Sequence, residues 1–81
     1  MPYITQSDRS ELITLEHSPE TSGELNYLFT HYIVDYVEEK GLSYQTINDV
    51  VGALEGAKME FYRRVAVPYE TRKCEENGDV Y

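Results

Sequence analysis

The 81-residue sequence contains no tryptophan, one cysteine and two histidines, and it has no long run of apolar residues. With Cys74 alone, the chain has neither an internal disulfide framework nor a four-cysteine zinc site, and we expect an ordinary reduced thiol. No stretch approaches the roughly 20 apolar residues that span a bilayer, and Met1 to Thr5 lack the basic start of a signal peptide. We therefore expect a soluble protein without a membrane partner.

Basic residues are also scarce. Seven Lys and Arg stand against 15 Asp and Glu, which gives a net charge of -8. A generic nucleic-acid-binding domain needs an excess of Lys and Arg on its binding face, so this balance disfavours nucleic acid as a partner. A chain of this length forms one domain and buries only about 60 to 65% of its unfolded surface, so its own core is marginal. Help from a partner subunit is therefore expected.

The first 19 residues form an arm in this interpretation. Their apolar residues recur at no regular spacing. The polar string from Thr5 to Ser10 nevertheless predicts about two turns of helix, with Ser7 as the cap. That helix would place Leu12, Ile13 and Leu15 against the main body of the protein.

Residues 20–41 predict the first long helix. Ser18 is the preferred cap, with Pro19 at the first position, although Thr21 or Ser22 would serve equally as the start. Gly41 suits the C-terminal end of this helix. Apolar residues follow at helical spacing, and they place Tyr32 and Tyr36 in the core; the full series is Leu25, Leu28, Phe29, Tyr32, Ile33, Tyr36 and Val37.

Residues 43–67 predict a second long helix, capped by Ser43, and it carries two glycines in its interior. Each should cost about 1 kcal/mol relative to alanine, and the close approach of another helix would offset that cost. Two apolar lines follow this helix. One consists of Ile47, Val51, Leu54, Phe61 and Val65, and the other of Tyr44, Gly52, Met59, Tyr62, Ala66 and Tyr69.

Together these segments predict an all-α fold: an antiparallel helical hairpin with an N-terminal arm and a short C-terminal extension over residues 68–81, all in one domain. Pro68 should end or kink the second helix near Val67, with a short helix resuming over residues 69–73 before an acidic tail. One antiparallel neighbour covers only one apolar line, so either the arm or another copy of the protein covers the second. We expect a homo-oligomer, with interface candidates Gly52, Gly56, Tyr44, Met59 and Tyr27.

An ordered string of short motifs resembles a family of small uncharacterised proteins encoded by tailed bacteriophages and prophages. The resemblance covers most of the chain from Gly23 onward, and it implies a phage origin and residence in the cytoplasm of an infected bacterium. It brings no reaction, ligand or catalytic residue with it. The motifs are Gly23-Glu24-Leu25-Asn26-Tyr27, Gly41-Leu42-Ser43-Tyr44-Gln45, Ile47-Asn48-Asp49, Gly52-Ala53-Leu54-Glu55, Glu60-Phe61-Tyr62-Arg63-Arg64, Pro68-Tyr69-Glu70 and Glu75-Glu76-Asn77-Gly78-Asp79-Val80-Tyr81.

The segment from Lys58 to Lys73 holds five of the seven basic residues against only two acids. The spacing predicts that Arg63 and Arg64 both pair with Glu60. The segment is interpreted either as a solvated face with salt bridges between subunits, or as an anion site in which guanidinium groups and tyrosine rings hold an anionic small molecule or an acidic partner. The binding candidates are Arg63, Arg64, Tyr62, Tyr69 and Lys58.

Signals for catalysis are poor. His31 and Asp35 lie one helical turn apart and could ligate a metal, but a third ligand is not evident. We therefore expect no enzyme, no catalytic residue, no metal and no cofactor. The preferred function is a phage accessory protein that binds a host or phage protein, with inhibition of a host process as one outcome. The alternative is a homo-oligomeric binder of a nucleotide-like anion, and a distant third is a metal-dependent hydrolase.

Overall fold

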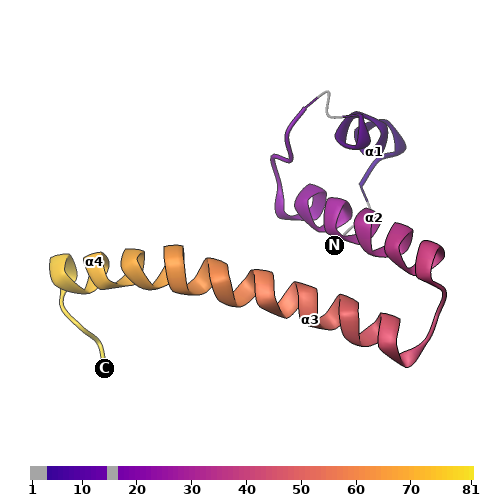
Figure 1. Ribbon diagram of the computed structural model, residues 1–81. Helices are drawn as coiled ribbons and strands as arrows, with labels where there is room; N and C mark the ends of the chain where they lie inside the picture. The colour runs from indigo at the N-terminus through magenta and orange to yellow at the C-terminus, as the bar shows by residue number, and fades with distance from the viewer. Residues whose placement is uncertain (1–3, 15–16) are drawn as a thin grey trace. The chain divides into compact units, whose positions relative to one another are not determined.

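A computed structural model describes residues 4–14 and 17–81, and over these residues the secondary structure is helical with no strand, which confirms the all-α fold class. The chain divides into two compact units, residues 1–46 and residues 47–81, and each is described by itself. The elements, labelled in Figure 1, are α1 (Gln6–Ile13), α2 (Ser22–Lys40), α3 (Tyr44–Phe61), a π-helical segment η1 (Tyr62–Ala66) and α4 (Val67–Asn77).

Helix α1 confirms the short helix expected in the arm, but its cap differs from the prediction. Thr5 accepts a hydrogen bond at Oγ1 from the backbone N–H of Asp8 at 3.1 Å, so the helix begins at Gln6 and Ser7 lies inside it. Both residues have cap chemistry, and the earlier start lengthens the helix. Leu12 on this helix is fully buried, whereas Ile13 is exposed. Leu15 lies outside the described residues.

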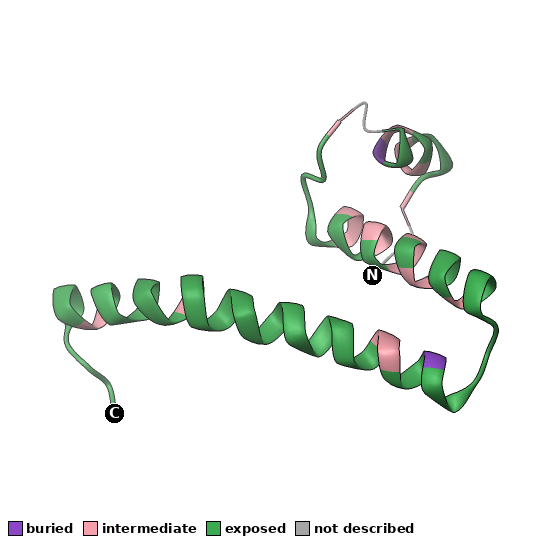
Figure 2. Ribbon diagram, viewed as in Figure 1, coloured by how far each residue is buried: buried purple, intermediate pink, exposed green. Residues whose placement is uncertain are grey.

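Helix α1 packs against α2, and this contact forms the core of the first unit. Leu12 is the buried apolar side chain among the described residues (Figure 2). Around it, the Arg9 guanidinium lies 5.7 Å from the ring centroid of Tyr27, and Arg9 Nε donates to the carbonyl of Ile4 at 2.9 Å. The contact of Arg9 with Tyr27 joins α1 to α2, whereas its hydrogen bond to Ile4 lies within the arm.

Helix α2 begins later than the preferred prediction. Thr21 is the cap and accepts from the Glu24 backbone N–H at 3.1 Å, so the start with Ser18 as cap is wrong and the Thr21 alternative is correct. At the other end Gly41 has φ +85° and donates to the carbonyl of Val37 at 2.8 Å. This positive φ confirms why a glycine ends the helix, since other residues rarely adopt it.

Two tyrosines of α2 were expected in the core, and that expectation is wrong. Tyr32 is 63% exposed and Tyr36 is 38% exposed. The physical reason is that α1 covers a neighbouring face of α2, where Tyr27, Leu28 and His31 are half-buried. The helical spacing correctly grouped the residues of one face but did not reveal which face the arm would cover.

Helix α3 is capped by Ser43, as predicted, since Ser43 Oγ accepts from the Thr46 backbone N–H at 3.1 Å. Thr46, the last residue of the first unit, is buried, and no described residue of the second unit is buried (Figure 2). The first apolar line of α3 is between 42% and 62% exposed along its length; its members are Ile47, Val51, Leu54, Phe61 and Val65.

The helical path does not end at Val67, so of the two outcomes predicted there, an end or a kink, the end is wrong, and the helix that follows is longer than the predicted residues 69–73. The path passes through η1 and continues as α4 to Asn77, so most of the expected extension is helical and only its last residues form a tail. Gly78, with φ +87°, donates to the Cys74 carbonyl at 2.8 Å and ends α4. Among the described residues, no helix combines the length and apolar character that crossing a bilayer requires.

Candidate functional site

The structure joins Arg63 and Arg64 to one carboxylate. Both guanidinium groups pair with Glu60, one to each carboxylate oxygen, which confirms the pairing predicted from the spacing. All three side chains are exposed, at 71% and 73% for the arginines and 48% for Glu60. One negative charge therefore faces two positive charges, and the group keeps a surplus of one positive charge. Lys58 lies apart from them and pairs with Glu55 at 3.8 Å.

Pro68 gives a physical reason for the π-helical segment that precedes it. Proline has no N–H to donate to the carbonyl four residues earlier, here that of Arg64, and its ring would clash with that carbonyl. In η1 the backbone N–H of Val67 bonds instead to the carbonyl of Tyr62, five residues back. The wider turn accommodates the proline without ending the helix.

The wider turn also changes which residues share a face. In a regular α-helix eight residues rotate by about 80° beyond two full turns, so Tyr62 and Glu70 would lie on different faces. In the structure Tyr62 OH donates to Glu70 Oε1 at 3.3 Å, because η1 rotates α4 back relative to α3. The second apolar line, predicted at constant spacing, therefore does not continue unchanged from Tyr62 into Ala66 and Tyr69.

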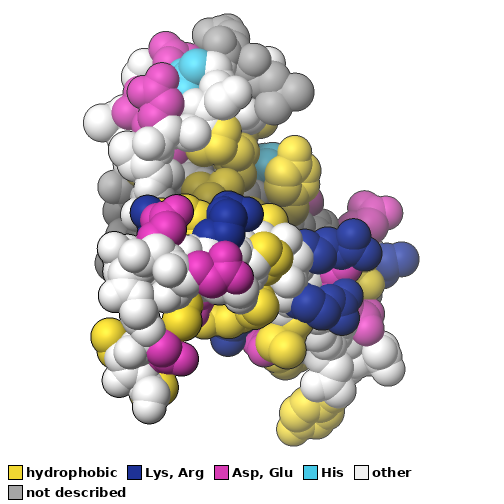
Figure 3. Space-filling model, turned by 90° about the vertical axis from the view of Figure 1, so that its left-hand side faces the viewer, with side chains coloured by type: hydrophobic (Ala, Val, Ile, Leu, Met, Phe, Trp, Pro, Cys, Tyr) yellow, Lys and Arg dark blue, Asp and Glu magenta, His cyan; other side chains and the backbone are white. Residues whose placement is uncertain are grey.

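Tyr69 instead forms a small cationic cluster on α4. Its ring centroid lies 5.9 Å from the Arg72 guanidinium carbon and 5.6 Å from Lys73 Nζ. Lys73 also lies 3.5 Å from a carboxylate oxygen of Glu76, whereas Arg72 pairs with no carboxylate within the described part of the chain. Sequence reasoning placed Tyr69 among the candidates but missed these two partners, although their spacing of three and four residues was the available signal. In Figure 3, Lys and Arg side chains lie among carboxylates and exposed hydrophobic side chains.

The interface candidates of α3 are open. Tyr44 is 89% exposed and Met59 is 58% exposed. At Gly52 and Gly56, no heavy atom of the described structure beyond the local helix lies within 4 Å of the position that a Cβ would occupy. The fifth candidate, Tyr27, lies on α2 in the first unit, half-buried beside Arg9.

Helix α2 carries an acidic depression near its C-terminal end. Two tyrosines and three acids line it: Tyr32, Asp35, Tyr36, Glu38 and Glu39. Glu38 and Glu39 form no ion pair with any other described residue, and Lys40 Nζ lies 6.0 Å from the ring centroid of Tyr36. Carboxylates are unfavourable in the last turn of a helix, where the backbone dipole is negative. This depression therefore combines uncompensated negative charge with a ring that already accepts a cation.

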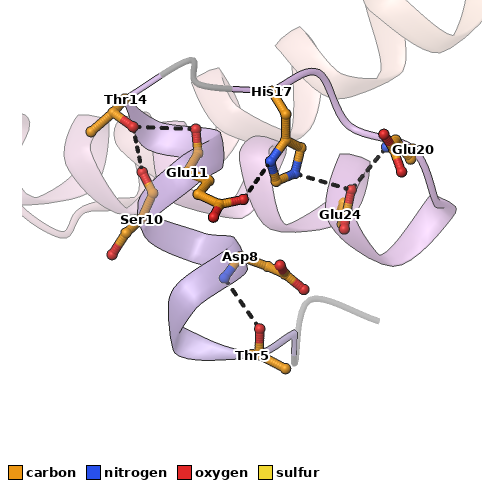
Figure 4. Close-up of polar contacts among 8 residues, drawn as sticks. All are labelled: Thr5, Asp8, Ser10, Glu11, Thr14, His17, Glu20 and Glu24. Atoms are coloured by element: carbon orange, nitrogen blue, oxygen red, sulfur yellow. Dashed lines mark hydrogen bonds and ion pairs between the residues drawn. The ribbon is translucent and has the colours of Figure 1, made fainter.

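The two histidines make contacts within the first unit. His17 Nδ1 lies 2.8 Å from Glu11 and its Nε2 lies 3.7 Å from Glu24, so the imidazole bridges α1 and α2 (Figure 4). His31 Nε2 lies 3.5 Å from Asp35, as the spacing predicted. Among residues 4–14 and 17–81, no three His, Cys, Asp or Glu side chains are placed to hold a metal ion together.

The fold and these surfaces define a small all-α chain with exposed, mixed-charge helical faces. The family described as "Domain of unknown function (DUF6899)" matches residues 1–80, and the chain belongs to this family. Neither a curated protein nor a solved structure matches the chain.

Proposed function

We propose that this chain is a non-enzymatic accessory protein, of bacteriophage origin, that acts in the cytoplasm of an infected bacterium by binding a basic segment of a host or phage protein. The observation that carries the proposal is the acidic depression of α2, with its two tyrosines and three carboxylates. Lys or Arg side chains of a partner would fit it, because a cation gains from both the tyrosine ring faces and the carboxylates.

The net charge of -8 supports the same class of partner. An acidic surface attracts a basic protein at long range and raises the rate of encounter. Many nucleic-acid-binding enzymes present basic surfaces, and blocking one of them would make the chain an inhibitor of a host process.

The supporting arrangement of helices is also a proposal. The link from Gly41 to Ser43 is short, which favours antiparallel neighbours, and the line of Ile47, Val51, Leu54 and Phe61 would then face α2. One such neighbour leaves the second line of α3 uncovered, so the arrangement includes a homo-oligomer assembled through that line.

The test is affinity purification of the full-length chain from infected cells, with three forms compared. The Glu38→Lys, Glu39→Lys variant reverses charge at the depression, and Glu20→Lys, Asp79→Lys makes the same change in net charge elsewhere. We expect a partner that is retained by the wild type and by the Glu20, Asp79 control but lost from the Glu38, Glu39 variant, and released by raising the salt concentration. Recovery of the same proteins with all three forms would contradict the proposal.

A second function is favoured by the cluster on α4, where Arg72 and Lys73 flank the Tyr69 ring. This cluster, with Arg63 and Arg64 one to two turns earlier, would bind a nucleotide-like anion. Such binding predicts a rise in melting temperature with nucleotides or inorganic phosphate that disappears in Arg64→Ala. An unchanged melting temperature across these ligands would exclude this alternative.

A further inference from the structure

His17 joins the two helices of the first unit through both of its ring nitrogens. Its Nδ1 lies 2.8 Å from Oε2 of Glu11 on α1, and its Nε2 lies 3.7 Å from Oε1 of Glu24 on α2 (Figure 4). The side chains of His17 and Glu24 are 26% and 13% exposed, so this contact is partly shielded from solvent. The imidazole is therefore a polar link between the arm and α2.

The number of protons on the imidazole decides how well this link holds. A neutral imidazole has one N–H that donates and one nitrogen that accepts. When Nδ1–H donates to Glu11, the lone pair of Nε2 faces the carboxylate of Glu24, which is unfavourable. The imidazolium has an N–H on both nitrogens and a positive charge, so it attracts both carboxylates.

The charges that face the imidazole are negative. Glu11 faces it from α1 and Glu24 faces it from α2, and within the described ranges neither carboxylate forms an ion pair with a Lys or Arg. Arg9, the basic residue of α1, is engaged elsewhere, with the ring of Tyr27. The two carboxylates are thus left to His17, and its positive form is the one that they favour.

We propose that His17 is a pH-sensitive clamp, which fastens the arm to α2 while its imidazole is protonated and loosens it once the imidazole is neutral. The contribution to docking is largest where histidine is protonated and glutamate is ionised, which for free side chains lies between about pH 4.3 and about pH 6.5. It is lost as the pH rises through the titration of His17. It also falls at lower pH, because the two carboxylates then become protonated.

Loosening the arm exposes the surfaces that it covers. Leu12 is fully buried in the contact between α1 and α2, and Tyr27, Leu28 and His31 are half-buried on α2. Since a single leucine is the buried apolar side chain among the described residues, the loss of one ion-paired link is a sizeable part of what holds the arm. A rise in pH should therefore increase the fraction of chains that present this face of α2.

The first test measures docking of the arm in the full chain. Amide hydrogen exchange of α1 is compared at about pH 5.5 and about pH 7.5, with each rate divided by the intrinsic rate at that pH. We expect protection to be about two- to fivefold higher at the lower pH, which is the effect of a partly exposed ion pair. His17→Gln should show equal protection at both. His31→Gln is the matched control, because His31 pairs with Asp35 within α2, and it should keep the wild-type difference.

The second test removes the charge that faces Nε2. Glu24→Gln keeps an oxygen that accepts from the backbone N–H of Glu20, a bond of 2.8 Å in the structure, but it no longer attracts the imidazolium. This variant should lose most of the pH difference in protection. Glu20→Gln makes the same change at a carboxylate that forms no ion pair with His17, and it should behave as wild type.

Either of two results overturns the inference. One is a wild-type chain in which protection of α1 is equal at the two pH values or higher at the upper one. The other is a pH difference that persists in His17→Gln. Circular dichroism identifies any variant that fails to fold, and an NMR titration of the wild type then decides. The ring signals of His17 and the methyl signals of Leu12 should change with one midpoint, and separate midpoints would contradict the clamp.

Discussion

The two units of this chain are built in different ways. In residues 1–46 two helices pack on each other, bury Leu12 completely and cross-connect through Arg9 and His17. In residues 47–81 a helical path of two α-helices and a π-helical segment continues to Asn77, and no described side chain in it is buried. The first unit therefore has a small core of its own, whereas the apolar lines of the second unit are exposed.

The ion pairs also differ between the two units. In the second unit the ion pairs of the described residues join positions three or four apart on the same helix. Exposed pairs of this kind stabilise a helix by only about 0.2 to 0.5 kcal/mol each. Because most helical stability in proteins comes from packing an apolar face, the second unit depends on a neighbour more than the first does.

The largest predicted effect removes the core of the first unit. Leu12→Ala should destabilise the α1–α2 contact by about 2 to 5 kcal/mol, since it deletes a fully buried side chain. Amide hydrogen exchange should show lost protection in α1 and near Tyr27 with little change in α4. Ile13→Ala, at a position that is 42% exposed, is the control and should change exchange little. Equal loss of protection in both units would show that they unfold together.

The next effect concerns the interruption in the second unit. A proline inside a helix costs about 3 kcal/mol relative to alanine, and η1 relieves part of that cost. Pro68→Ala should therefore stabilise the helical path by about 1 to 3 kcal/mol and restore regular α-helical spacing. NMR should show the Val67 amide bonding to Arg63 rather than Tyr62, and the Tyr62–Glu70 hydrogen bond should disappear. A π-helical segment that persists in this variant would mean that Pro68 is not its cause.

Most helix boundaries were predictable because their signals are local. Gly41 and Ser43 end one helix and begin the next as the sequence predicted, since each acts through its own backbone or hydroxyl. The start of α1 was not predicted, because Thr5 and Ser7 have the same capping chemistry and local sequence does not choose between them. Pro68 signalled an interruption, but whether a helix ends, kinks or widens there depends on small differences in energy.

The contacts of the candidate site were also predictable only in part. The pairing of Arg63 and Arg64 with Glu60 followed from spacing alone. The contact of Tyr62 with Glu70 did not, because it exists only once the π-helical segment has rotated α4. Exposure of Tyr32 and Tyr36 was also missed, since it depends on which face of α2 the arm covers. Sequence spacing thus predicts these contacts within one turn of regular helix and fails where a π-helical segment or a separate element changes which residues share a face.

A smaller effect tests the N-terminal cap of α3. Ser43→Ala removes the acceptor for the Thr46 backbone N–H and should destabilise α3 by about 1 kcal/mol. Urea denaturation followed by circular dichroism measures the loss. Ser43→Thr keeps the hydroxyl and should retain most of the stability, so an equal loss in both variants would show that the hydrogen bond is not the cause.

The smallest predicted effect is that of adding a methyl group at Gly52, and the direction of the change in melting temperature shows whether the second line of α3 is covered. Among the described residues nothing obstructs a methyl group at Gly52, so Gly52→Ala should gain about 0.5 to 1 kcal/mol of intrinsic helix stability. If a second copy packs on this line, the same methyl group pushes the two backbones apart and raises the dissociation constant. Thermal unfolding at increasing protein concentration separates the two contributions, because only the second grows with assembly. We expect the variant to melt higher than wild type when dilute and to lose that advantage when concentrated. An advantage that is equal at every concentration would mean that this line faces solvent and that no second copy packs on it.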